Sequence, residues 1–205
     1  MYDGGPRPVA LTTQRKAIQK GADGLIAVAA GAGGHAGVTS PFAMVQELRS
    51  WYDGPLALAG SIASGRSVLA AQAMGADFAY VGSAFIATHE ANASDAYKQA
   101  IVEGDSAQIV YSSLFTGVSG NYLRPSIVSA GLDPDNLPDG DVTKMSFGQG
   151  DGKKDVSKAW RDIWGCGQGI GHISAVEGAG AVVDRLAAEY AEAAAAVEQH
   201  SKLSR

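Results

Sequence analysis

The chain has 205 residues, of which 46% are apolar and only 18% are charged, and its formal net charge is −5 at pH 7. This composition is typical of a folded α/β protein and unlike that of a disordered chain. Lys and Arg form no cluster of the kind that a nucleic-acid surface requires, and no stretch approaches the roughly 20 uninterrupted apolar residues of a membrane span. We therefore expect neither a nucleic-acid nor a membrane partner.

The N-terminus and the cysteine content indicate the compartment. The opening residues, MYDGGPRPV, lack the charged-then-apolar pattern of a secretory signal. The single cysteine, Cys166, cannot form an internal disulfide, which suits a reducing environment. The sequence therefore predicts a cytoplasmic protein, and we expect no metal site in it.

Three short apolar runs predict buried parallel strands at residues 24–30, 55–60 and 78–82. None of them alternates with polar residues, which is typical of strands that are covered on both faces. The segments IQKGADGLIAVAAG and AQAMGADFAYVGSA also resemble each other, since both lead from a helix end through Gly-Ala-Asp into a strand that finishes on glycine. Repeated βα units of this kind build a parallel sheet, either open or closed into a barrel.

Helices are predicted between these strands. The first, residues 41–51, has Ser40 as a candidate N-cap and an apolar face made of Phe42, Val45 and Leu48. The second, residues 65–74, follows Ser64 and ends at Gly75, a natural C-cap.

The pattern changes after residue 91. A helix is expected at 92–103, a loop-rich stretch at 114–158 with the turn-forming clusters GLDPDNLPDGD and GQGDGKKD, and a last helix at 175–200. We therefore predict βα units at 1–91, a small second lobe or lid at 92–165, and a loop and C-terminal helix at 166–205 that return to the first part. The apolar side of the last helix is expected to comprise Val182, Val183, Leu186, Tyr190 and Val197.

Two glycine-rich segments match known phosphate motifs incompletely. GAGGHA, residues 31–36, has the form G-x-G-x-x-A of a dinucleotide fingerprint, but Asp53 precedes the second strand, whereas the ribose-binding acid belongs at that strand's end. GSIASGRS, residues 60–67, resembles a P-loop in which Arg66 replaces the lysine, and no acidic residue ends the next strand to hold magnesium.

A third interpretation takes two strand ends together. In (βα)8 barrels a phosphate often binds at the loops after the last two strands, on backbone N–H groups and a helix N-terminus. Gly60, Ser61, Gly82 and Ser83 would supply such groups here. Each glycine alone indicates no more than a tight turn, but all three interpretations place a phosphate-bearing ligand at these strand ends.

Longer segments carry a family resemblance. ADGLIAVAAGAGGHAG, followed by LALAGSIASGRSVLAAQAMGADFAYVGSAFIATHEA, resembles the C-terminal part of the nitronate monooxygenases, formerly called 2-nitropropane dioxygenases. YSSLFTGVSGNYLRPS and AWRDIWGCGQGIG extend the resemblance over about residues 15–190. It implies a TIM-barrel flavoenzyme that uses FMN and O2 to oxidise nitronates or nitroalkanes.

The resemblance also implies roles for individual residues. Gly33 and Gly34 would line the flavin, while Gly60, Ser61, Gly82 and Ser83 would surround its phosphate. His35 matches the catalytic histidine, and imidazole suits that task because it exchanges protons near neutral pH. His89, His172 and His200 lack such a setting, and Cys166 is expected to be a small buried residue without a nucleophilic role.

Departures from the family pattern leave alternatives open. Ser61 stands where many members have glycine, Val28 stands where many have glutamine, and the family's first strands are missing. We therefore expect a partial barrel that could self-associate through its incomplete edge. A flavin-dependent enoyl-thioester reductase using NAD(P)H remains an alternative function, as does a truncated remnant without catalysis.

Overall fold

The computed structural model describes residues 9–140 and 162–203 of the protein. Its first sheet is parallel and has the strand order β1-β3-β4, with β1 at Leu25–Val28, β3 at Leu56–Ala59 and β4 at Phe78–Tyr80. The three predicted strands are thereby confirmed, each shortened by one or two residues at its ends. Their carboxyl ends share one edge of the sheet, because β3 pairs in parallel with both neighbours.

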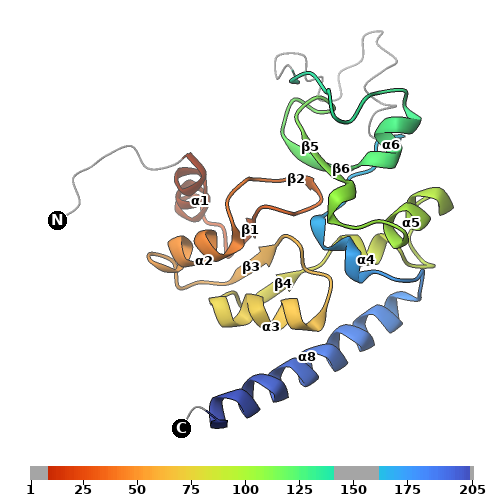
Figure 1. The fold of residues 1–205 in the computed structure, drawn as a ribbon. Helices are drawn as coiled ribbons and strands as arrows, with labels where there is room; N and C mark the ends of the chain where they lie inside the picture. Colours follow the sequence, from red (N-terminus) through yellow and green to blue (C-terminus); the bar gives the residue numbers. More distant parts are fainter. Residues whose placement is uncertain (1–8, 141–161, 204–205) are drawn as a thin grey trace.

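Helices cover one face of this sheet (Figure 1). α1 (Val9–Gln19) precedes β1, while α2 (Pro41–Arg49) and α3 (Gly65–Met74) connect the three strands in turn. The covered face of β1 and β3 packs against α2 in the main apolar core, whose largest fully buried members are Leu56, Leu58, Leu48 and Val45.

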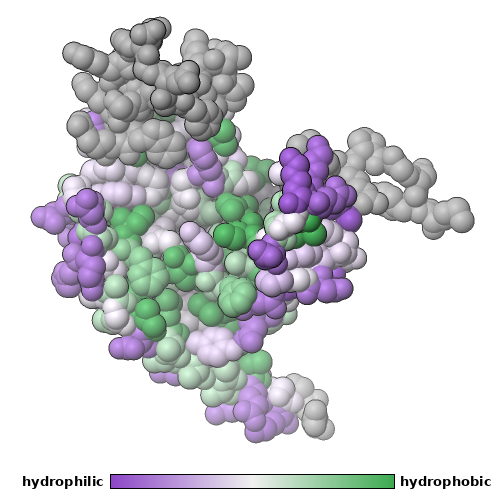
Figure 2. All heavy atoms as spheres, turned by 180° about the vertical axis from the view of Figure 1, so that it is seen from behind, coloured by the Kyte–Doolittle hydropathy of each residue, from purple (hydrophilic) through white to green (hydrophobic). Residues whose placement is uncertain are grey.

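The opposite face of the same sheet is open. Ile26 and Val28 of β1 lie in register with Phe78 and Tyr80 of β4, across the alanines of β3, and all four large side chains are exposed. Broad apolar areas are also visible on the side of the molecule turned away from the view of Figure 1 (Figure 2). The expectation that both faces are covered is therefore wrong for the part of the chain that the structure describes.

A second, antiparallel sheet was not predicted. It has the order β2-β6-β5, with β2 at Gly34–His35, β5 at Ile109–Ser112 and β6 at Gly120–Leu123. α6 (Arg124–Ser129) follows β6 directly, so the region expected to be loop-rich contains a buried strand and a helix. The cluster GQGDGKKD of that prediction lies outside the described residues. β2 and β6 pair through Gly34 with Asn121 and His35 with Gly120, which joins the two sheets.

The remaining elements complete the frame. α4 (Ser83–Ile86) and α5 (Asp95–Val102) follow β4, the 3-10 turns η1 and η3 span Ser106–Gln108 and Gln168–His172, and α8 (Ala179–Leu203) ends the described chain. The helices predicted at 92–103 and 175–200 are thus confirmed with shifted bounds. Of the apolar side predicted for α8, Val182 is buried, whereas Val183 and Val197 are exposed.

The ends of α2 and α3 can be compared with the capping residues that the sequence predicts. Ser64 caps α3, accepting from the backbone N–H of Ser67, and Gly75 ends the helix at φ +110°, as predicted. Ser40 occupies the N-cap position of α2, as predicted, although its side chain makes no capping hydrogen bond. Phe42, in the first turn of α2, is 62% exposed, whereas Val45 and Leu48 are buried, so the predicted apolar face is only partly covered.

α3 and α8 pack at unusually close range. A Cβ atom built on Gly65 would lie 2.2 Å from both the Leu186 carbonyl oxygen and the Tyr190 nitrogen. Glu189 of α8 also accepts a hydrogen bond from the Gly65 N–H at 2.7 Å. The first turn of α3 is therefore anchored directly on the α8 backbone.

Because of this contact, we expect one added methyl group at residue 65 to change the stability of the protein strongly. Gly65→Ala should lower the free energy of unfolding by about 1–3 kcal/mol or more, since backbone atoms of α8 would have to move. Gly180→Ala is the matched control, because its Cβ meets nothing within 4 Å and alanine favours the helix by up to about 1 kcal/mol. Urea denaturation followed by circular dichroism compares the variants. Equal stability of the two would contradict the close packing of α3 on α8.

Candidate functional site

The end of β1 leads into a glycine corner, residues 31–34, which contacts a later segment of the chain backbone to backbone. A Cβ on Gly33 would lie 2.8 Å from the Gly167 nitrogen, and the N–H of Gln168 donates to the Gly31 carbonyl at 2.9 Å. Any side chain at Gly33 would separate the two segments, so glycine is required there by packing.

The later segment, residues 163–169, is fixed to three other elements. The Gly167 N–H donates to the Ser83 hydroxyl at 2.9 Å, and the Cys166 N–H donates to the Asn121 carbonyl at 3.1 Å. The Asn121 side-chain amide donates in turn to the Ala32 carbonyl at 2.7 Å. The ends of β1 and β4 and the strand β6 are thus held around one point.

A cavity of about 1100 Å³ lies beside this point. All of the site residues predicted from the sequence line it, together with the open face of the parallel sheet through Ile26, Val28 and Tyr80. The predicted residues that the structure brings together here are Gly33, Gly34, His35, Gly60, Ser61, Gly82 and Ser83.

The predicted glycines have two different roles. A Cβ on Gly34 or on Gly82 would meet no atom within 4 Å, so both positions open onto free space. Gly60 is different, because at φ +135° its Cβ would lie 2.8 Å from the Ala30 carbonyl. Gly34 and Gly82 therefore leave room for a ligand, while Gly33 and Gly60 permit close packing of the protein itself.

Both serines predicted to surround the phosphate make contacts with other segments of the chain. Ser61 has φ +56°, and its hydroxyl lies where a side chain on residue 31 would be, so it fits only because that residue is glycine. Its N–H donates to the Gly31 carbonyl at 3.2 Å. The hydroxyl of Ser83 accepts a hydrogen bond from the N–H of Gly167, in the 163–169 segment.

The N-terminus of α3, the helix that follows Gly60 and Ser61, is already capped. The first N–H groups of α3 bond to the side chains of Glu189 and Ser64. A phosphate at these strand ends would therefore face the turn at Gly82 and Ser83, where the cavity is open, more directly than the start of α3.

His35 is exposed at the edge of the cavity, on β2. Its Nε2 atom lies 2.9 Å from the hydroxyl oxygen of Thr116, a buried residue in the turn before β6. The histidine is thus placed by strand pairing on one side and by a side-chain hydrogen bond on the other.

Sequence reasoning missed an aromatic wall of the cavity. Tyr97 and Trp164 stack with ring centroids 5.0 Å apart, and the Tyr97 hydroxyl donates to the Gly165 carbonyl. Burial raises the pKa of Tyr97, so this hydroxyl stays protonated. The alternating glycines of WGCGQG were the available signal, because they allow this segment to run against the glycine corner.

Cys166 is fully buried at the centre of this arrangement. Burial raises the pKa of its thiol to about 11, so the thiol stays protonated near neutral pH. The prediction that Cys166 is a buried small residue is therefore confirmed.

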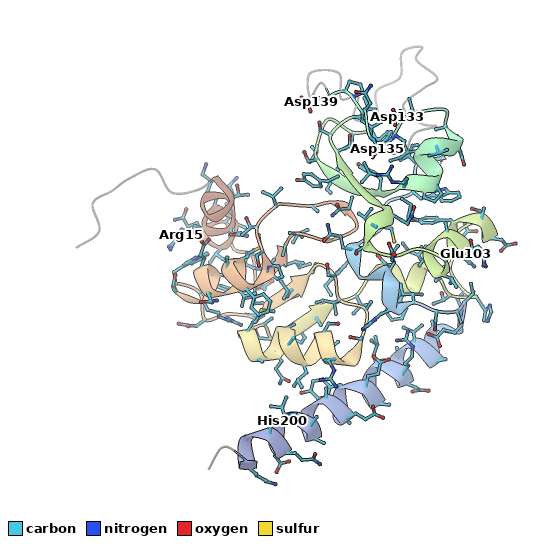
Figure 3. All side chains as sticks on the ribbon, viewed as in Figure 1. Arg15, Glu103, Asp133, Asp135, Asp139 and His200 are labelled. Carbon is cyan, nitrogen blue, oxygen red and sulfur yellow. The ribbon has the colours of Figure 1, made fainter. Side chains whose placement is uncertain are left out.

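The other histidines lie outside the cavity lining. His89 and His172 are exposed, and His200 lies near the C-terminal end of α8 (Figure 3). In the described ranges, 9–140 and 162–203, His, Cys, Asp and Glu form no group that could hold a metal ion. No helix of this part of the chain is long and apolar enough to cross a membrane.

Comparison with known families agrees with the residues around the cavity. The family model described as nitronate monooxygenase matches residues 7–131. The chain belongs to this family. The match includes the glycine corner, His35 and both glycine-ended strands that follow.

Individual members of the nitronate monooxygenase family are similar over the same region. A nitronate monooxygenase of Paraburkholderia phytofirmans is 29% identical over 123 residues, which is 56% of this chain and 34% of that protein. A probable nitronate monooxygenase of Bacillus subtilis is 32% identical over 108 residues, covering 48% and 31%. The chain spans about a third of the length of these relatives.

Solved structures extend the similarity to most of the chain. A nitroalkane oxidase from Streptomyces ansochromogenes superposes with a TM-score of 0.69 at 27% identity, covering 89% of this chain and 56% of that one. FabK from Thermotoga maritima gives a TM-score of 0.72 at 23% identity, covering 92% and 61%. At that identity the likeness to FabK shows the fold alone.

Proposed function

We propose that this chain forms the flavin-binding part of an oxidoreductase that acts on nitronates or nitroalkanes, with FMN as the cofactor and O2 as the final acceptor. One observation carries the proposal: a histidine stands at the edge of a cavity of about 1100 Å³, next to glycine positions that leave its wall open. Membership of the nitronate monooxygenase family and the similarity to a nitroalkane oxidase support it.

The cavity fits a flavin in size and lining. Small-molecule sites usually have volumes of about 300–1000 Å³, so this one has room for a cofactor and a small substrate beside it. Ile26, Val28 and Tyr80 offer an apolar surface to a planar ring, and Gly34 presents no side chain. When bound, the flavin would supply the redox chemistry, taking electrons from the substrate and passing them to O2.

The phosphate is proposed to lie at the turn formed by Gly82 and Ser83. Backbone N–H groups and a hydroxyl are suitable donors to a phosphate, and the space in front of Gly82 is empty. Gly60 and Ser61 shape the neighbouring strand end and complete the proposed set of cofactor-binding residues.

His35 is proposed to act as the base for neutral nitroalkanes. It would take the proton from the carbon that bears the nitro group, and the electron pair of that C–H bond would move into the nitro group to give the nitronate. The resulting imidazolium carries a positive charge and would hold the nitronate by electrostatic attraction. With a substrate that is already a nitronate, only this second role remains.

We also propose that β1, β3 and β4 are consecutive strands of a (βα)8 barrel. Parallel pairing, connecting helices on one face and an apolar opposite face all support this assignment. In the described residues β1 pairs only with β3, so its outer edge and the apolar face are available for association.

The open face predicts self-association of the 205-residue chain. Sedimentation velocity should show dimers or larger species at micromolar concentration. Ile26→Lys together with Phe78→Lys should shift the distribution towards monomer, because both exposed side chains lie on the open face. The matched control, Val183→Lys with Val197→Lys on α8, should leave association unchanged. A monodisperse monomer of the unmodified chain would contradict the prediction.

A separate prediction concerns the phosphate. Gly82→Val should weaken FMN binding at least about tenfold, because the new side chain fills the open space without backbone strain at φ −117°. Riboflavin, which lacks the phosphate, should be affected much less. Flavin fluorescence titration measures both ligands.

Gly37→Val is the matched control, since Gly37 lies near His35 but does not line the cavity. Unchanged FMN affinity in Gly82→Val would place the phosphate elsewhere. Failure of the unmodified chain to bind FMN at all would count against a flavin site in these residues.

A further prediction tests the role of His35 as the base. His35→Ala should reduce kcat/KM for nitroethane by about 10²–10⁴-fold, since proton removal is lost. The reduction for ethyl nitronate should be far smaller, because that substrate has no proton to give up. His89→Ala is the control, as this exposed histidine lies outside the cavity lining. Equal losses on the two substrates would reject the base role and leave only binding.

A further inference from the structure

One buried hydroxyl in the wall of the cavity has no hydrogen-bond partner in the described part of the chain. Within these residues, buried side-chain oxygen or nitrogen atoms without such a partner belong to Gln14, Arg15, Trp51, Asn121 and Tyr122. Of these, only Tyr122 lines the cavity. Its side chain is 2% exposed, so bulk water does not reach the hydroxyl. An unpaired buried hydroxyl costs free energy, which a ligand with a hydrogen-bond acceptor would recover.

Packing holds the Tyr122 ring in place. The residue lies in β6, the middle strand of the antiparallel sheet, which pairs with both β2 and β5. The ring contacts that of Phe115 edge to face, with the centroids 4.9 Å apart. Ile127 and Ile163 complete the apolar cluster around it. The hydroxyl therefore has a fixed position before any ligand binds.

The hydroxyl lies beside the strand pair that carries His35. A Cβ built on Gly120 would lie 3.0 Å from the Tyr122 hydroxyl and 2.7 Å from the Gly34 carbonyl. Gly120 is in register with His35, and Gly34 is the residue before it. Because Gly34 and Gly120 both lack a side chain, neither covers the hydroxyl. It is therefore close to the backbone of the strand that presents the proposed base.

The chemistry of the cavity lining indicates what this hydroxyl can bind. In the described residues the lining contains no Asp, Glu, Lys or Arg side chain, so an anion in the cavity depends on polar donors. The hydroxyl of Tyr97, which is also in the lining, already donates to the Gly165 carbonyl. The proton of the Tyr122 hydroxyl is not committed in this way. A donor that is fixed in advance stabilises most an atom on which negative charge develops during the reaction.

We propose that the Tyr122 hydroxyl donates a hydrogen bond to a nitro oxygen of the substrate and so stabilises the nitronate. This inference rests on the proposed function and adds a substrate-binding residue to it. When the C–H bond breaks, its electron pair moves into the nitro group, the proton goes to His35, and Tyr122 keeps its own proton. The hydrogen bond strengthens as the oxygen gains charge, because bonds to ionised acceptors are roughly twice as strong as those between neutral groups.

An unpartnered hydroxyl has a distinctive effect on stability. Tyr122→Phe removes the oxygen and keeps the ring, so the midpoint of urea denaturation of the ligand-free chain should stay the same or rise. Tyr97→Phe is the matched control, because it removes a hydroxyl that donates to Gly165, and its midpoint should fall. An equal fall in both variants would show that the Tyr122 hydroxyl is bonded within the protein and would overturn the proposal.

Binding of a stable anion tests the site without catalysis. Nitrate is planar and negatively charged and, like a nitronate, presents oxygens on nitrogen. Isothermal titration calorimetry with sodium nitrate, in the presence of excess FMN, should give an affinity at least about tenfold weaker for Tyr122→Phe than for the unmodified chain. For 2-methyl-2-nitropropane, a neutral nitro compound without a proton to lose, the affinity should fall at most about threefold. Tyr190→Phe, on α8 and outside the cavity lining, should change neither affinity.

Kinetics separate Tyr122 from the proposed base. Tyr122→Phe should reduce kcat/KM by about 10- to 100-fold for nitroethane and for ethyl nitronate alike, because both substrates place a nitronate oxygen at the hydroxyl. His35→Ala, in contrast, should spare the nitronate. A loss confined to nitroethane would contradict the role of Tyr122 as a donor to the nitronate.

The outcomes also separate this inference from the proposed function. Unchanged nitrate affinity in Tyr122→Phe would overturn the inference, and so would a loss of FMN affinity in that variant, since the hydroxyl would then belong to the cofactor site. If nitrate affinity falls as expected in a chain that turns over no nitroalkane, the result would support Tyr122 as an anion donor. It would count against the proposed function instead.

Discussion

The backbone contact between the glycine corner and residues 163–169 is the constraint on which the candidate site depends. Gly33 approaches Gly167 so closely that a single Cβ would have to displace backbone atoms. Hydrogen bonds from the same later segment reach Gly31, Ser83 and Asn121. Through this one contact, the strand ends of the parallel sheet, the antiparallel sheet and the aromatic wall of the cavity are held in fixed relation.

The glycines that line the cavity near this contact serve two opposite purposes. At Gly33 and Gly60 the missing side chain lets protein pack on protein, while at Gly34 and Gly82 it leaves space unfilled. A motif made of repeated glycines cannot distinguish these purposes, because both leave the same letter in the sequence. The three-dimensional neighbours decide, and they lie more than 100 positions away for the Gly33–Gly167 contact.

Local signals in the sequence therefore predicted the parallel sheet well and the antiparallel sheet beside Thr116 poorly. The three strands are continuous apolar runs that end in glycine, and the capping pair Ser64 and Gly75 marks the bounds of α3. β2 has only two residues and owes its conformation to pairing with β6, so no periodicity could reveal it. The same long-range pairing brings Thr116 to His35. The exposure of Phe42 was missed for a related reason, since the direction that a helix presents to its sheet is set by tertiary packing.

The open sheet face and the cavity are parts of one surface, and this links stability to ligand binding. Ile26, Val28 and Tyr80 are exposed on the sheet and also line the cavity, so apolar area that remains in contact with water forms one wall of the proposed flavin site. Covering such area is favourable by about 25 cal/mol per Å², whether the cover is a planar ring or another polypeptide. A cofactor and an associating chain would compete for this wall if they cover the same side chains. If the associating chain instead closes the cavity around the ring, the binding of each would favour the binding of the other. These side chains line the same cavity as the glycine corner and His35. The way in which the open face is covered therefore also determines how far the proposed base is shielded from water.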